Sequence, residues 1–140
     1  MDNNMKLKGI LIAAALAVTV LANAAGLPWA KDYNSALSTA KKTKKVVMLD
    51  FTAVWCVNCH KLDRTTYVDP QVVRLLGAAV PVQIDYDKQP ALAKKYKAAA
   101  LPVIIFTDSS GKELGRISKY VDAKEFVSLA TPILARGRGK

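Results

Sequence analysis

Two cysteines three positions apart are the residues of this chain whose type and spacing best suit chemistry. The run Trp55-Cys56-Val57-Asn58-Cys59-His60 contains both cysteines of the 140-residue sequence. A thiol attacks a disulfide as the thiolate, and the first turn of a helix favours that charge through its unpaired N–H groups and dipole. We expect a helix from Cys56 to about Thr66, with Cys59 one turn beyond Cys56. The spacing therefore predicts a redox-active dithiol in which Cys56 attacks and Cys59 resolves the mixed disulfide.

The alternative roles for this pair are a structural disulfide and a zinc site. A disulfide across so short a loop removes little entropy from the unfolded chain, so a structural role explains the two cysteines poorly. A structural zinc site needs about four ligands, whereas the chain has two cysteines and one histidine, His60. Zinc would require carboxylates or a second chain to complete the site. We therefore favour redox chemistry, and we expect no metal and no cofactor.

Two ionisable residues near the cysteines have two interpretations each. Histidine is the side chain that commonly takes part in proton transfer, so His60 could modulate the thiols, although a partly exposed helix residue is the simpler interpretation. Asp50 interrupts the apolar run 46–51. Burial there would raise its pKa and provide a proton acceptor or donor beside the dithiol. Alternatively, Asp50 is a carboxylate at the end of a sheet that meets solvent.

The apolar periodicities indicate one α/β domain with a mixed sheet flanked by helices on both faces. Apolar runs predict strands over residues 46–51, 80–85, 102–107 and 113–118. Helical spacing predicts helices over residues 29–40, 56–66, 70–76 and 90–96, and a last one that begins at Asp122. Asp69-Pro70 and Asp122 are typical helix starts, since Asp accepts from free N–H groups and Pro suits the first helical position.

The N-terminal residues predict export. Lys6 and Lys8 precede an uncharged apolar run over residues 9–21, and Ala22-Asn23-Ala24 is typical of a cleavage site. We expect a signal peptide over 1–24, a single folded domain over 25–134 and a flexible basic tail over 135–140. An uncleaved membrane anchor that extends to Leu27 is the alternative. Either interpretation places the domain in the periplasm or another extracytoplasmic compartment.

The formal net charge of +10 comes from lysines and arginines that are scattered along the chain. These charges do not alternate with exposed aromatic residues, and no nucleic-acid-binding motif is present. We therefore expect solvated basic faces on a monomer that does not bind nucleic acid.

The pattern of residues around the cysteines resembles the thioredoxin superfamily over Trp29–Leu134. The matching positions are Asp50-Phe51, Trp55-Cys56-x-x-Cys59, Ile84-Asp85, Tyr96 and Leu101-Pro102. The resemblance implies the thioredoxin fold. Within the superfamily, residues 46–63 and 65–76 are most similar to the periplasmic C-terminal domain of the DsbD reductant transporters.

The resemblance also implies roles for two acidic residues. Asp50 matches the buried acid beneath the dithiol, which assists proton transfer at Cys59. Asp63 matches a second acidic position near the active site of the DsbD domain. The residues alone would make Asp63 a surface charge on a helix.

Two further positions gain substrate-binding roles from the resemblance. Pro102 matches the cis-proline of the superfamily, which leaves the backbone of Leu101 free to pair with an extended substrate. Trp55 would pack beside Cys56 and shield its thiolate, with ordinary core packing as the alternative.

Together these residues predict an exported thiol–disulfide oxidoreductase, and reduction of periplasmic protein disulfides is our leading hypothesis. Its partners would be disulfide-bearing exported proteins and a membrane or thioredoxin-like electron donor. The dipeptide Val57-Asn58 between the cysteines differs from those of the familiar superfamily members and leaves the direction of electron flow open. A disulfide oxidase or isomerase, and a non-catalytic thioredoxin-like binding module, are the alternatives.

Overall fold

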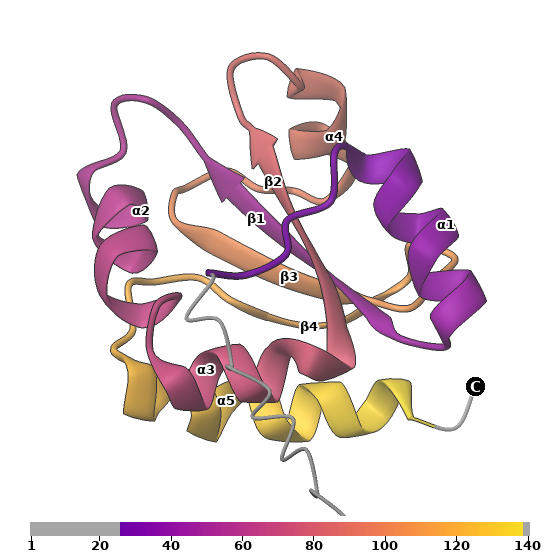
Figure 1. The fold of residues 1–140 in the computed structure, drawn as a ribbon. Coiled ribbons are helices and arrows are strands. Elements are labelled where there is room, and N and C mark those ends of the chain that lie inside the picture. Colours follow the sequence, from indigo (N-terminus) through magenta and orange to yellow (C-terminus); the bar gives the residue numbers. More distant parts are fainter. Residues whose placement is uncertain (1–25, 139–140) are drawn as a thin grey trace, which may run out of the picture.

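The computed structural model describes residues 26–138 and contains a four-stranded sheet in the order β2-β1-β3-β4 (Figure 1). Strand β1 (Val46–Thr52) pairs in parallel with β2 (Ala79–Asp85) and antiparallel with β3 (Val103–Thr107). Strand β4 (Glu113–Ile117) completes the sheet antiparallel to β3. The predicted mixed sheet is thus confirmed.

Two pairs of helices cover the two faces of this sheet. On one face, α1 (Tyr33–Thr43) and α4 (Pro90–Lys95) enclose a core that includes the alternate β1 residues Val47, Leu49 and Phe51. On the other face, α3 (Pro70–Leu75) and α5 (Ala123–Gly137) pack over Met48. Strand β1 is therefore buried on both sides, which explains its nearly continuous apolar sequence.

The first helix begins later than the predicted start at residue 29. Asp32 forms a capping box: its carboxylate accepts from the Ser35 N–H at 2.7 Å, and its own N–H donates to Ser35 Oγ at 3.0 Å. Trp29 consequently lies before α1, and its ring packs edge-on against Tyr67 with centroids 5.5 Å apart. The prediction that Trp29 belongs to the helix is wrong, because apolar spacing alone does not locate a cap.

The helix predicted over residues 56–66 is present in two parts. An α-helix, α2 (Val57–Lys61), continues directly into a π-helical turn, η1 (Leu62–Thr66). The N–H of Tyr67 closes the wider turn by donating to the Leu62 carbonyl, five residues earlier, at 3.0 Å. Single π turns are often found next to functional sites. Here the turn leads into Tyr67, whose side chain is buried.

The remaining elements follow the predicted order. Asp69 caps α3, which ends in a short 3-10 turn, η2 (Leu76–Ala78). Asp122 caps α5 as expected, but this helix continues to Gly137, beyond the boundary that we expected at residue 134. The Arg136 guanidinium holds this last turn by donating to the Leu114 carbonyl at 2.9 Å.

The predicted signal segment, residues 1–24, lies outside the described residues. Within residues 26–138, no helix is long and apolar enough to cross a membrane.

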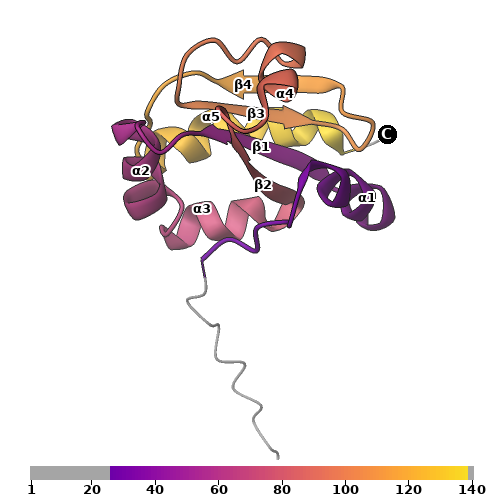
Figure 2. The same cartoon turned by 90° about the horizontal axis from the view of Figure 1, so that it is seen from above.

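Helices α2 and α1 lie near opposite ends of β1 (Figures 1 and 2).

The packing predicts a large loss of stability for Phe126→Ala. This fully buried ring lies 6.1 Å from the ring of Tyr67 and 6.4 Å from that of Phe106. Removing it should lower the free energy of unfolding by about 3–5 kcal/mol in urea titrations, through lost burial and a residual cavity. Leu129→Ala, at a 39% exposed position of the same helix, should cost much less. Equal losses in both variants would contradict this packing.

Candidate active site

The two cysteines lie where the chain leaves the central strand and enters helix α2. Cys56 is the N-cap of α2, and its sulfur accepts from the backbone N–H of Cys59 at 3.1 Å. The two residues form a disulfide, with their Cα atoms 5.3 Å apart. Cys56 is 5% exposed and Cys59 2%, so both cysteines are largely covered by their neighbours.

Three exposed apolar residues, Val54, Trp55 and Val57, flank Cys56 in the sequence, and we call them the apolar rim. These side chains are 84%, 61% and 75% exposed, respectively. The Trp55 indole N–H donates to the Asp87 carboxylate at 2.9 Å, and its ring packs edge-on against Tyr86. Trp55 is thus held at the surface, and core packing, the alternative interpretation of this residue, is wrong.

Asp50 lies in the middle of β1 and is 1% exposed. Its carboxylate accepts hydrogen bonds from the Tyr67 hydroxyl at 3.0 Å and the Gln83 amide at 3.2 Å. Burial raises the pKa of Asp50 to about 7, because desolvation of the charged form outweighs these two hydrogen bonds. The interpretation of Asp50 as a solvent-facing carboxylate at a sheet end is wrong.

Gln83 connects Asp50 to the second acidic residue. The parallel register of β1 and β2 places Gln83 beside Asp50, and the Gln83 amide also donates to the Asp63 carboxylate at 3.0 Å. Partial burial raises the pKa of Asp63, while the nearby His60 opposes the shift. Asp63 thus belongs to a hydrogen-bonded group with Asp50, Gln83 and Tyr67.

His60 lies beside this group, near the surface. Its Nδ1 atom is 3.8 Å from the Asp63 carboxylate, and its Nε2 donates to the Val54 carbonyl at 2.9 Å. The ring therefore links the start of the exposed rim to the acidic residues. The structure brings His60 and Asp63 together, as well as Asp50 and Asp63.

Sequence reasoning missed Tyr67 and Gln83, which hold the Asp50 carboxylate. Gln83 was detectable as the polar residue within the otherwise apolar stretch 79–84. Its contact with Asp50 nevertheless depends on the register between two strands. Burial and the adjacent carboxylates raise the pKa of Tyr67, so its hydroxyl stays protonated and can donate to Asp50.

The loop before β3 forms another side of the site. The Leu101–Pro102 peptide bond is cis. Leu101 and Tyr86 pack against a small apolar group that consists of Ala53, Cys56 and Cys59. The sulfur of Cys59 also lies 3.8 Å from the Phe51 carbonyl oxygen. Residues from β1, α2 and the segment before β3 thus meet at the cysteine pair.

The described residues offer no alternative metal centre. Across residues 26–138, no group of three or more His, Cys, Asp or Glu side chains is arranged to hold a metal ion.

A Cys-x-x-Cys disulfide at a helix start, on a mixed sheet between two helix layers, defines a thiol–disulfide oxidoreductase of the thioredoxin class. The model of the thioredoxin-like domain family matches residues 33–131. The chain therefore belongs to the thioredoxin-like family.

Known relatives agree with this assignment. The chain is 38% identical over 101 residues to the thiol:disulfide interchange protein DsbD of Pectobacterium atrosepticum, and the match covers 68% of this chain and 17% of the relative. The match to DsbD of Cronobacter sakazakii is 39% identical over 103 residues and covers 69% and 18% of the two chains. The chain thus corresponds to less than a fifth of the length of these relatives.

Solved structures show the same fold. A thioredoxin from Thermus thermophilus superimposes with a TM-score of 0.72 at 26% identity, covering 81% of this chain and 92% of the other. The oxidoreductase DsbH gives 0.70 at 26% identity, covering 79% and 86%. The C-terminal domain of Neisseria meningitidis DsbD gives 0.60 at 22% identity, covering 69% and 88%.

The buried carboxyl group predicts a pH-dependent stability. Because the pKa of Asp50 is raised from 3.8 to about 7, the folded protein retains a proton there that the unfolded chain releases. The free energy of unfolding should therefore fall as the pH rises from about 4 to about 7 and then level off. The contribution is at most on the order of 4 kcal/mol. Urea titrations of the oxidised protein across this range measure it.

Asp50→Asn should remove most of this dependence, because the amide does not ionise. Asp32→Asn is the matched control, since Asp32 is a carboxylate with a lowered pKa at an exposed helix start, and asparagine also caps helices. The control should keep the decline between pH 4 and pH 7. The same decline in Asp50→Asn would show that another group causes it.

Proposed function

We propose that this protein is an exported reductase of protein disulfides that uses Cys56 and Cys59 through a mixed-disulfide intermediate. The observation that carries the proposal is the position of the pair, with Cys56 at the helix start beside an exposed apolar rim and Cys59 more deeply covered. The position at the helix start favours Cys56 as the attacking sulfur. The similarity to the thiol:disulfide interchange protein DsbD supports disulfide exchange as the chemistry of this pair.

The first step forms the mixed disulfide. The Cys56 thiolate attacks one sulfur of the partner's disulfide, a Cys56–partner S–S bond forms, and the other partner sulfur leaves as a thiolate that takes up a proton. The N–H of Cys59, which donates to the Cys56 sulfur at 3.1 Å, stabilises the attacking charge. Val54, Trp55 and Val57 provide apolar contact for the partner around this sulfur.

The second step releases the partner. Cys59 loses its proton and attacks the Cys56 sulfur, which closes the disulfide seen in the structure and expels the second partner thiol. The partner gains two electrons and two protons, and the dithiol loses them. We assign Asp50 as the group that accepts the Cys59 proton, because its pKa of about 7 allows both uptake and release near neutral pH. Asp63 and His60, joined to it through Gln83, modulate this transfer.

The segment before β3 would hold the partner chain. We propose that the Leu101 backbone pairs with an extended segment, as an added strand does. Since Leu101 packs against the cysteine group, such a segment would pass directly over Cys56.

A continuing cycle needs a second protein that restores the dithiol. We propose that another dithiol protein, membrane-bound or thioredoxin-like, donates two electrons by the reverse exchange. The basic and apolar pattern of residues 1–24 supports export to the periplasm or an equivalent compartment.

The mechanism predicts different defects for the two cysteine variants. Cys56→Ser should lower the rate of reduction of a protein disulfide to the uncatalysed level, because the attacking sulfur is lost. Cys59→Ser should accumulate a covalent complex with the partner, visible on a non-reducing gel and lost on reduction, because the resolving sulfur is missing. Full activity of Cys56→Ser would contradict the mechanism. Wild-type thiols that do not exchange with glutathione would favour the binding-module alternative.

A further inference from the structure

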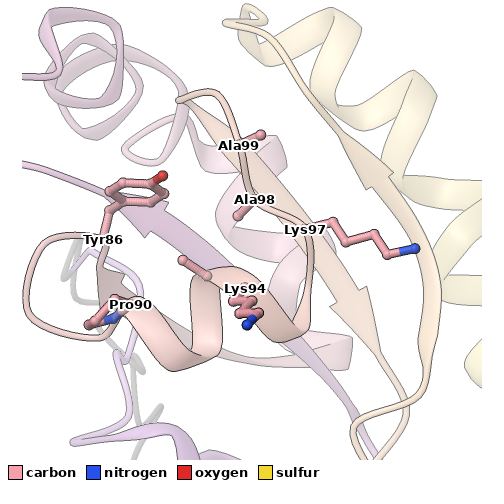
Figure 3. Close-up of a pocket in the computed structure, with 7 residues that line it drawn as sticks. Tyr86, Pro90, Lys94, Lys97, Ala98 and Ala99 are labelled. Carbon is pink, nitrogen blue, oxygen red and sulfur yellow. The ribbon is translucent and has the colours of Figure 1, made fainter.

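An open cleft of about 340 Å³ lies between Tyr86 and the end of helix α4. We call it the α4 cleft, and its lining includes Tyr86, Pro90, Lys94, Lys97 and Ala98. Figure 3 shows Tyr86 at one end of this cleft and Lys97 at the other. The steps proposed above for disulfide reduction do not use it.

The α4 cleft adjoins the cysteine pair through Tyr86 and the segment before β3. The Tyr86 ring lines the cleft and also packs against the apolar group of Ala53, Cys56 and Cys59. From the opposite wall, the chain continues through Ala99 to Leu101, which packs against the same group. A partner segment attached to Cys56 can therefore extend into the cleft.

Two lysines at the α4 end of the cleft lack acidic partners. Lys94 and Lys97 are exposed, and neither forms an ion pair within the described part of the chain. Lys95 lies between them in the sequence but is engaged elsewhere, since its Nζ donates to the Tyr33 hydroxyl at 3.2 Å. The α4 end of the cleft thus carries two positive charges without counter-charges.

The acidic residues near Tyr86 are already engaged. Asp85 accepts from the backbone N–H groups of Asp87 and Lys88, at 3.0 and 3.1 Å, and lies 3.7 Å from the Lys88 ammonium. Asp87 accepts from the Trp55 indole. Asp85 precedes Tyr86 and Asp87 follows it, so both carboxylates near the Tyr86 end of the cleft already have partners, whereas Lys94 and Lys97 have none among the ion pairs of the described residues.

Lys97 also occupies a backbone conformation that suits glycine better. It follows the end of α4 with a φ of 51°. The N–H of Ala98 donates to the Ala93 carbonyl at 2.8 Å, and that of Lys97 to the Lys94 carbonyl at 3.1 Å, which is the Schellman arrangement. Glycine adopts this left-handed conformation without steric cost, so Lys97→Gly removes the charge while preserving the turn.

Lys44 provides a matched position. It follows α1 with a φ of 54°, at the end of β1 opposite the cysteines. Lys44→Gly therefore makes the same change of charge and backbone preference away from the cleft.

We propose that the α4 cleft binds an acidic segment of the partner protein, adjacent to the cysteine that Cys56 attacks. An apolar partner residue beside that cysteine packs on Tyr86, and carboxylates further along the segment meet Lys94 and Lys97. This inference rests on the proposed function and specifies its substrate class.

Two synthetic peptides test this proposal. Each contains one cysteine in a mixed disulfide with 2-nitro-5-thiobenzoate, and its flanking residues are either four glutamates or four glutamines. Attack by Cys56 on the peptide sulfur forms a protein–peptide disulfide and releases the coloured thiolate, so stopped-flow absorbance gives a second-order rate constant for the reduced protein. The wild type should react faster with the acidic peptide.

The matched variants locate the effect. Lys97→Gly and Lys94→Gln should each lower the rate constant for the acidic peptide by about two- to five-fold, as expected for exposed charge pairs, and leave that for the glutamine peptide unchanged. Lys44→Gly should change neither rate constant. Lys97→Gly should also unfold at no lower temperature than the wild type, which separates lost binding from lost folding. High salt should reduce the preference in the wild type.

Each contrary result has a distinct meaning. Equal reaction of both peptides with the wild type, or an equal loss in Lys44→Gly, would overturn the cleft proposal while leaving disulfide exchange intact. Failure of the reduced wild type to react with either peptide would overturn the proposed function together with the cleft.

Discussion

The Asp50 carboxyl group lies in the middle of the central strand, where water does not solvate its charge. Such a group is costly unless hydrogen bonds support it or it holds a proton. The structure uses both means: Tyr67 and Gln83 donate to the carboxylate, and the pKa rises to about 7. The parallel register that supplies Gln83 and the π turn that leads into Tyr67 are therefore part of the same solution.

In our account, the same architecture separates proton transfer from partner recognition. Gln83 joins the two acidic residues, Asp50 and Asp63. Tyr67 donates to Asp50, and His60 lies beside Asp63. The rim of Val54, Trp55 and Val57, in contrast, is exposed to solvent. Cys56 and Cys59 lie at the start of α2, shortly after β1 ends. In our account, a partner contacts the rim and the segment near Leu101 while the buried carboxyl group exchanges protons from the other side.

Local sequence features predicted much of the fold and the centre of the site. Strand β1 was evident from its apolar run, the starts of α3 and α5 from Asp69 and Asp122, and the dithiol from the cysteine spacing. The contacts of Gln83 and Tyr67 were not predictable from spacing, because they require the cross-strand register and one extra residue in a helical turn. The start of α1 was missed because the apolar spacing continues past its cap.

The central claim is that Cys56 and Cys59 form a dithiol that reduces protein disulfides. Its most direct test is the reduction potential of the pair, obtained by equilibrating the protein with defined ratios of reduced and oxidised glutathione and quantifying the free thiols. A reductase should have a potential of about −270 to −200 mV, in the range of thioredoxin and glutaredoxins. A potential near about −120 mV, that of a strong periplasmic oxidant, would contradict the account and reverse the direction of electron flow.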